Sequence, residues 1–198
     1  CFICEDDASS RAVLRTQNRC PMCPTYTLKL NPPGKLVEHV AMHILHDPIV
    51  RNRDSPCGFC GGSGDSCAVF LRKGKGRDGM VAIDVVKSRC KNGNVVKLSI
   101  AASQESVANS PSTNHPIPCP LCPTSTPAIW KYNLKDHIEI AHPTADVELY
   151  QDSYALETVE IAALLKHWNT KQRWTKARLR DLGNINISDV HSAQLNSA

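Results

Sequence analysis

One short pattern occurs twice in this chain and restricts its possible folds more than any other feature. Each copy has a Cys-Pro-x-Cys-Pro-Thr segment, then a leucine three residues before the first of two histidines. The copies provide Cys20, Cys23, His39 and His43, and then Cys119, Cys122, His137 and His142. Two thiolates and two imidazoles form a tetrahedral ligand set typical of structural Zn²⁺. Because the whole arrangement recurs, we expect two such sites.

A third group of cysteines lies between the two copies. It consists of Cys57, Cys60, Cys67 and Cys90, and no histidine occurs in that interval. Residues 69–71 and 81–86 are rich in β-branched side chains and flank a glycine-rich turn, which predicts a hairpin that returns Cys90 toward the other three. We therefore expect a Cys4 zinc site that resembles a zinc ribbon. The alternative is a small β unit with buried free thiols.

Cys1 and Cys4 form a further C-x-x-C pair, but no histidine follows it before His39. The spare imidazole nearest in sequence is that of His46. The pair therefore belongs either to a fourth zinc site that includes His46 or to an incomplete one. His46 would also suit the C-terminal end of a helix, where a cation is favourable.

The ten cysteines could instead form disulfides. The partner histidines, and the lack of a signal peptide in this sequence, favour reduced thiolates on zinc, as in cytosolic or nuclear proteins. Because the sequence begins at Cys1 rather than at Met, we expect it to be a segment of a longer protein.

The two repeated segments resemble the Cys2His2 zinc-finger family, which implies a β-hairpin followed by a helix at each. The second cysteine and the first histidine are separated by 15 and 14 residues here, against about 12 in the family pattern. The chain is also similar to Cys/His-rich segments of basidiomycete fungal proteins. Those segments combine C-P-x-C-P, H-x-x-x-H-I-L-x-D and P-C-G-x-C, which correspond here to residues 20–24, 39–47 and 56–60. This second resemblance implies no particular function.

The composition suggests that metal, rather than one large core, folds the chain. Only 5% of the residues are aromatic, and one structural zinc contributes about 10 to 16 kcal/mol in finger peptides. We expect small zinc-stabilised α+β modules, with two variant ββα fingers flanking the ribbon-like hairpin and a C-terminal helix. The expected divisions are residues 1–50, 55–102, 103–118 (a linker), 119–150, 151–183 (an amphipathic, then basic helix that Gly183 ends) and 184–198 (a disordered tail).

Two basic surfaces make nucleic acid the favoured partner. One is the hairpin tip with Arg72, Lys73, Lys75 and Arg77, and the other is the C-terminal helix with Lys171, Arg173, Lys176 and Arg178. Such cations would contact phosphates, although each run could also be a solvated surface. The net charge of +4 permits this function without requiring it.

The finger resemblance also implies which residues would contact bases. The corresponding positions are Pro32, Lys35 and Glu38 in the first finger, and Trp130, Asn133 and Asp136 in the second. The first set is poorly suited, whereas Asn133 could bind an adenine edge. For Trp130, a hydrophobic cap over the zinc core is the favoured interpretation.

These observations predict a zinc-dependent nucleic-acid-binding module of a larger nuclear protein, with DNA favoured over RNA. The alternative is a protein-interaction module of a chromatin or regulatory protein, since acidic residues surround the second finger. We expect no enzyme and no small-molecule substrate. The H-x-E and P-C-x-x-C halves of a deaminase motif occur in reverse order, and His142 would close the position that a catalytic zinc leaves open. No apolar run is long enough for a membrane span.

Overall fold

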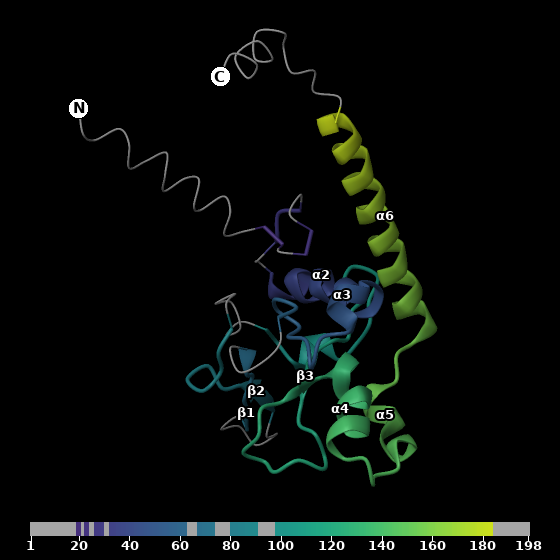
Figure 1. Cartoon of the computed structure of the whole chain (residues 1–198). Helices are drawn as coiled ribbons and strands as arrows, with labels where there is room; N and C mark the ends of the chain where they lie inside the picture. Colours follow the sequence, from purple (N-terminus) through teal and green to yellow (C-terminus); the bar gives the residue numbers. More distant parts are fainter. Residues whose placement is uncertain are drawn as a thin grey trace, which may run out of the picture. The chain divides into compact units, whose positions relative to one another are not determined.

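The computed structural model describes residues 19–20, 22–23, 26–29, 32–62, 67–73, 80–90 and 98–183, with side chains described as far as residue 172. The chain divides into two units after Trp168, and the features below lie in the first unit unless stated. It is a small α+β structure with short antiparallel strand pairs and several helices (Figure 1).

The longest helix of the first metal-binding segment is α2 (Pro33–His46). It begins at a proline, whose fixed φ and missing N–H suit the first helical position. Its residues from Leu36 to Ile44 are all buried, so the helix is covered on every side rather than along one stripe. Asp47 separates it from the short helix α3 (Pro48–Arg51).

The predicted hairpin is present but shorter than expected. Strand β1 (Leu71–Lys73) pairs antiparallel with β2 (Val81–Ile83), and Leu71 lies opposite Ile83. The second strand ends early because the carboxylate of Asp84 accepts hydrogen bonds from the backbone N–H groups of Val86 and Lys87, which turns the chain. Val86 is consequently exposed rather than part of a strand.

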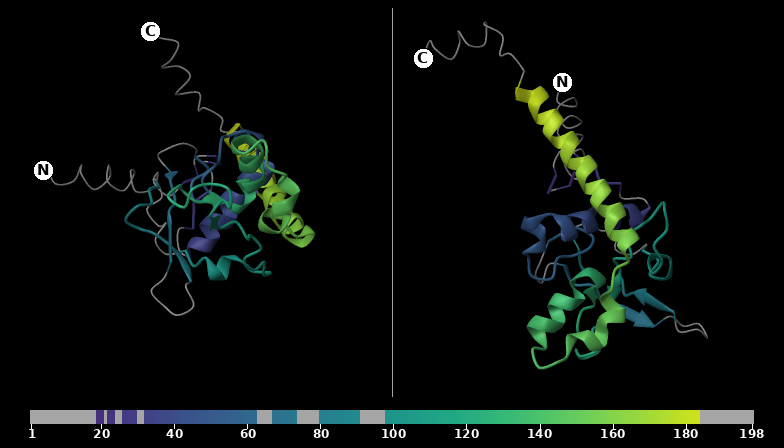
Figure 2. Two further views of the ribbon diagram at one scale, coloured as in Figure 1. Left: turned by 90° about the horizontal axis from the view of Figure 1, so that it is seen from below. Right: turned by 90° about the vertical axis from the view of Figure 1, so that its right-hand side faces the viewer.

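The second repeated segment contains β3 (Pro116–Ile117), which pairs antiparallel with β4 (Ile129–Trp130). The chain continues through the 3-10 turn η4 (Lys131–Asn133) into α4 (Leu134–Ala141), so a helix follows the strand pair as the finger resemblance implies. Pro143 follows directly and cannot continue the helix. Two short elements, η5 (Val147–Tyr150) and α5 (Gln151–Tyr154), pack beside α4 (Figure 2).

The three metal-binding segments share one hydrophobic core, although the composition suggested several small ones. Leu36 and Val40 of α2, Phe59 from the central segment and Trp130 of β4 belong to one buried cluster. The rings of Phe59 and Trp130 meet edge to face, with centroids 4.8 Å apart. A separate small cluster contains Cys119, Leu134 and Ile138. The expectation of separate small cores is therefore wrong for the centre of the molecule.

Part of the segment expected to be a linker is buried. Residues 112–115 have at most 7% of their surface exposed. The backbone N–H and hydroxyl of Thr113 donate to the carboxylate of Glu160 at 2.6 and 2.9 Å. The polar composition reflects specific internal partners here, rather than exposure to solvent.

The C-terminal helix α6 (Thr158–Gly183) ends at the predicted glycine and starts later than expected, because Ala155 is extended after α5. Leu164 is fully buried against Ala41 and Met42 of α2. Val159, in the first turn of the same helix, is 74% exposed. Within the described residues, no helix has the length and apolar character needed to cross a bilayer. Beyond Trp168, residues 169–183 continue as helix in the second unit.

Candidate metal centres

The structure brings each predicted ligand set together. In every set, four ligand atoms lie within 4.8 Å of one another. We name the sets the N-terminal site (Cys20, Cys23, His39, His43), the central site (Cys57, Cys60, Cys67, Cys90) and the C-terminal site (Cys119, Cys122, His137, His142). Each could hold one metal ion.

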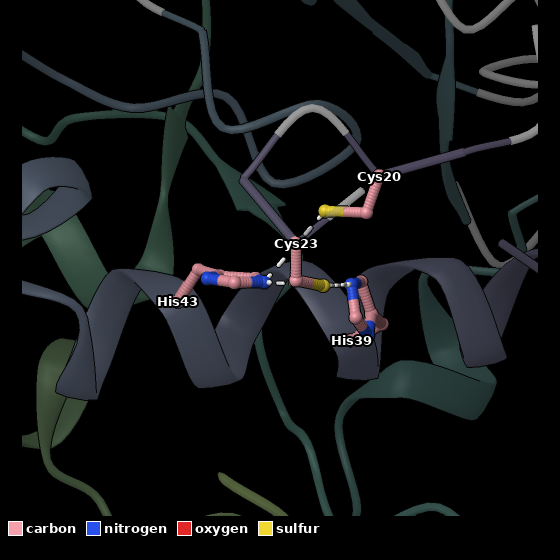
Figure 3. Close-up of side chains that lie close together, drawn as sticks. All are labelled: Cys20, Cys23, His39 and His43. Carbon is pink, nitrogen blue, oxygen red and sulfur yellow. Dashed lines mark hydrogen bonds between the residues drawn. The ribbon is translucent and has the colours of Figure 1, made fainter. Parts of the chain in front are cut away.

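The N-terminal site combines a turn with one face of α2 (Figure 3). The turn is closed by hydrogen bonds from the backbone N–H of Tyr26 to Cys23 O and of Cys20 to Tyr26 O. The Sγ of Cys23 lies 3.4 Å from Nε2 of both His39 and His43, and that of Cys20 lies 3.7 Å from Nε2 of His43. Because His39 and His43 are four residues apart, the helix places both rings on the same face.

The electrostatics of the N-terminal site favour a bound cation. The hydrogen bond from Cys23, with those from both histidines, lowers the pKa of Cys20 to about 2 despite burial. Burial lowers the pKa of His43, but its contacts with Cys20 and Asp47 raise it overall. The lowered pKa favours the thiolate form of Cys20, which is the form that binds metal.

The central site is held by a tight turn and the hairpin. Backbone N–H groups of Gly61 and Cys57 donate to Cys57 O and Gly62 O, both at 2.7 Å. The hairpin returns Cys90 to within 3.9 Å of Cys57, measured between Sγ atoms, while Cys60 and Cys67 are 3.3 Å apart. The β-branched residues of the two strands had predicted that a hairpin would bring Cys90 close to the other three cysteines, and this prediction is confirmed.

The central thiols differ in their proton affinity. Hydrogen bonds from Cys57 and Cys90 lower the pKa of Cys60 to about 2. Hydrogen bonds to Cys60, Cys67 and Cys90 raise the pKa of Cys57. The Cys60 thiolate therefore accepts hydrogen bonds from neighbouring thiols that keep their protons, and a bound cation would replace those protons.

The C-terminal site lies between the β3–β4 pair and α4. The Sγ of Cys122 lies 3.3 Å from Nε2 of His137 and 3.2 Å from Nε2 of His142, and that of Cys119 lies 3.6 Å from Nε2 of His142. Burial and the neighbouring His142 lower the pKa of His137. A neutral imidazole is the form that binds a metal.

These distances suit tetrahedral coordination. Ligands about 2.0 to 2.3 Å from a central zinc ion stand about 3.3 to 3.8 Å apart when the geometry is tetrahedral. Sulfur–nitrogen distances of 3.2 to 3.7 Å in both Cys2His2 sets agree with that range. The donor sets are compatible with zinc, since soft thiolates and imidazoles favour it over calcium or magnesium.

The proposed fourth site falls largely outside the described residues, because Cys1 and Cys4 are not among them. His46 is half-buried near the end of α2, and no hydrogen-bond partner for its Nε2 is found within the described part of the chain. Burial and then Arg51 lower the pKa of His46, which disfavours the helix-end cation interpretation. A fourth metal stays a prediction.

The turn of the central site also joins the other two segments. A Cβ added to Gly61, whose φ is +64°, would lie 2.6 Å from Sδ of Met22, between the first two cysteines. A Cβ added to Gly58 would lie 2.3 Å from the ring of Trp130. The sequence gave no signal for these contacts, because both partners are distant along the chain.

The structure corrects one predicted base contact. Asn133 is 5% exposed, and its Nδ2 donates to Pro56 O at 2.7 Å. It is therefore committed to the protein interior and not available to a base edge. Trp130 is 3% exposed and is a core residue, but it packs in the central cluster with Phe59 rather than over the second finger's own zinc ligands. The side chain of Lys35 binds Glu38 at 2.8 Å.

The predicted phosphate contacts are described only in part. Arg72 and Lys73 are exposed on β1. Lys75 and Arg77 lie outside the described residues, as do the side chains of Arg173, Lys176 and Arg178, whereas Lys171 is half-buried. Two cations that the sequence analysis did not select, Lys87 and Arg89, are also exposed just beyond β2.

Comparisons with protein-family models, with curated proteins and with solved structures found no match for this chain. The metal-binding interpretation rests on the three Cys/His clusters themselves. Membership in the Cys2His2 family, and the likeness to the fungal segments, stay predictions.

Proposed function

We propose that this segment is a zinc-stabilised nucleic-acid-binding module of a larger nuclear protein, and that it contacts the phosphate backbone of DNA in preference to RNA. The observation that carries the proposal is a group of exposed cations on the hairpin unit, which the central site holds in place. These cations are Arg72, Lys73, Lys87 and Arg89.

Zinc in this proposal is structural. Each site offers four protein ligands, which complete a tetrahedral shell and leave no position for a substrate. We therefore propose neither catalysis nor a small-molecule substrate. Metal bound at three sites would fix the turns that the small strand pairs alone could not hold.

Cations outnumber acidic residues on the described part of the hairpin unit. Among its described residues, 67–73 and 80–90, the single acidic side chain is Asp84, which accepts hydrogen bonds from Val86 N and Lys87 N. Arg72 lies opposite Ala82 in the pair of strands, while Arg89 donates its backbone N–H to Ala68 O. The hairpin thus holds cations from two distant stretches of sequence on one small unit, as phosphate binding requires.

Base recognition by the helices is not part of the proposal. Helix α2 is buried from Leu36 to Ile44, so it has no free face for a major groove. The exposed side of α4 carries Asp136 and Glu139, which would repel phosphates. We expect affinity that depends weakly on sequence, because backbone contacts carry little sequence information.

A protein partner is the second candidate function, favoured by the surface around α4. Ile140 and Leu149 are 75% and 77% exposed. They lie among exposed acidic residues, namely Asp136, Glu139, Asp146, Glu148 and Asp152. Exposed apolar side chains with surrounding charges are common at protein interfaces.

The test is a titration of the zinc-loaded protein against labelled duplex DNA, single-stranded DNA and RNA at two salt concentrations. Replacing Arg72, Lys73, Lys87 and Arg89 together with Ala should weaken binding to every duplex sequence. Each lost phosphate contact should reduce the slope of log K against log salt by about 0.9.

The matched control is Lys135→Ala, which removes an exposed cation that faces Glu139 across 3.9 Å on α4. It should leave the affinity and the salt slope unchanged. If the native protein binds no nucleic acid at low salt more tightly than about 10⁻⁴ to 10⁻⁶ M, the protein-interaction function replaces the one proposed.

A further inference from the structure

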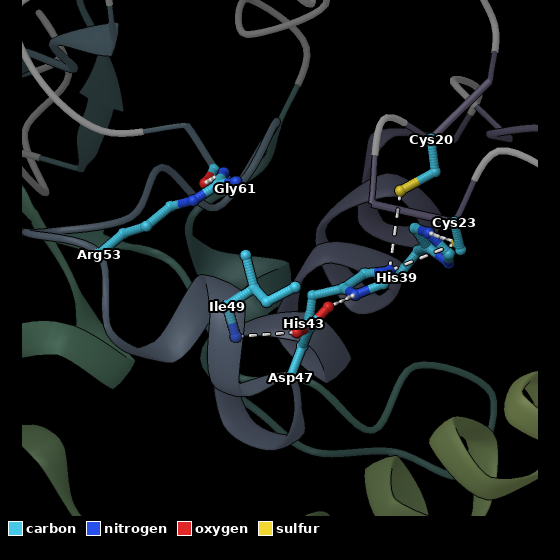
Figure 4. Close-up of polar contacts among 8 residues, drawn as sticks. All are labelled: Cys20, Cys23, His39, His43, Asp47, Ile49, Arg53 and Gly61. Carbon is cyan, nitrogen blue, oxygen red and sulfur yellow. Dashed lines mark hydrogen bonds and ion pairs between the residues drawn. The ribbon is translucent and has the colours of Figure 1, made fainter.

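One carboxylate outside the four ligands of the N-terminal site contacts a ligand directly. Oδ2 of Asp47 lies 3.0 Å from Nδ1 of His43, whose Nε2 faces the two cysteines (Figure 4). Oδ1 of the same carboxylate accepts a hydrogen bond from the backbone N–H of Ile49 at 3.0 Å, at the start of α3. One oxygen of the carboxylate is therefore fixed by the N-terminus of α3, and the other is hydrogen-bonded to the imidazole of His43.

This contact selects one form of the histidine. A carboxylate beside Nδ1 accepts a hydrogen bond from the N–H group at that nitrogen, so the proton stays on Nδ1 and the lone pair of Nε2 is left for the metal. It also fixes the plane of the ring and makes Nε2 a stronger donor. His43 is 1% exposed, so no water competes for Nδ1.

We infer that Asp47 is a positioning residue of the N-terminal site, which orients His43 and strengthens its bond to the metal. The inference rests on the proposed zinc binding and goes beyond it, because it assigns unequal affinities to sites with the same ligands. The N-terminal site should bind zinc more tightly than the C-terminal site.

The C-terminal site provides a natural comparison. Asp146 follows His142 by four residues, as Asp47 follows His43, and its carboxylate also accepts a backbone hydrogen bond two residues on, from Glu148. However, α4 ends at Ala141, whereas α2 continues to His46. Among the described residues, no carboxylate is hydrogen-bonded to either imidazole of the C-terminal site.

The helical path explains the difference between the two aspartates. In α2 the backbone N–H of Asp47 still donates to His43 O, so the aspartate lies one turn above the ring. His142 has left helical geometry, with φ −132° and ψ 58°, and Pro143 prevents a further turn.

The experiment measures zinc affinity of the full chain by competition with a chromophoric chelator. Asp47→Ser keeps a helix-capping oxygen but is too short to reach His43. Asp47→Asn keeps the cap and removes the charge. In both variants one of the three zinc ions should bind about 10- to 100-fold more weakly. Asp146→Ser and Asp146→Asn, the matched controls, should leave all three affinities unchanged.

A second measurement separates positioning from capping. Nitrogen-15 NMR of the zinc-loaded native protein should show His43 as a single tautomer with the proton on Nδ1. In Asp47→Ser, the same spectrum should no longer show a single fixed tautomer. If Asp47→Ser binds three zinc ions as tightly as the native chain, Asp47 is only a helix cap and the inference is wrong. If the native chain binds no zinc, the proposed function fails, and the inference fails with it.

Discussion

At the scale of single residues, a close contact joins Gly58 to Trp130. The indole is 3% exposed, and its ring lies where a side chain at position 58 would have to be placed. A glycine is needed at position 58 for space and not for backbone conformation. Its φ is not positive, because among the described glycines only Gly61 has a positive φ. The contact fixes the second repeated segment against the turn that carries Cys57 and Cys60.

Replacing Gly58 with Ala should therefore lower the free energy of unfolding of the zinc-loaded protein by about 1 to 3 kcal/mol, the usual cost of overpacking a core. Chemical denaturation followed by circular dichroism would measure it. The control is Gly34→Ala in α2, where the new Cβ would lie 3.8 Å from Ser110 Oγ. Alanine favours a helix, so Gly34→Ala should not destabilise. Equal stability of Gly58→Ala and the native protein would show that the Trp130 ring can shift.

At the scale of elements, α6 docks through polar contacts as much as apolar ones. Glu160 is 1% exposed and accepts hydrogen bonds from Thr113 and from the hydroxyl of Tyr132. One turn later Leu164 packs on α2, and Nδ1 of His167 lies 3.0 Å from Glu38. The amphipathic pattern predicted a helix with an apolar face, to which Leu164 belongs. It could not predict the burial of Glu160, because a buried carboxylate needs a partner, and that partner is 47 residues away.

Replacing Glu160 with Ala should cost about 2 to 4 kcal/mol, because each buried donor left without an acceptor costs about 1 to 3 kcal/mol. Amide hydrogen exchange should become faster in residues 112–115 and in the first two turns of α6. Glu139→Ala is the control, since Glu139 is 49% exposed and faces Lys135 at the surface. It should change stability by no more than about 0.5 kcal/mol. Unchanged exchange at residues 112–115 in Glu160→Ala would contradict the docking role.

At the scale of the whole molecule, the sequence predicted the metal sites well and their packing poorly. Ligand spacing is local, so a turn or a helix places each pair of ligands with little help from the rest of the chain. The shared core depends on contacts between distant segments, such as Met22 against Gly61 and Phe59 against Trp130. No periodic pattern encodes these pairs. The same non-local packing buried Asn133, which a finger-like alignment placed at a base contact.

The shared core makes the three sites unequal in their effect on stability. Replacing Cys60 with Ser should remove the central metal and also loosen the N-terminal site, because Phe59 of the same turn packs in the cluster that contains Leu36 and Val40 of α2. Amide protection in α2 should fall by at least about tenfold.

Replacing Cys122 with Ser is the matched control, since the C-terminal ligands pack on a separate cluster with Leu134 and Ile138. Native mass spectrometry should show two retained metals in Cys122→Ser and fewer in Cys60→Ser. Two tightly bound metals in both variants, with α2 still protected, would mean that the three units fold independently.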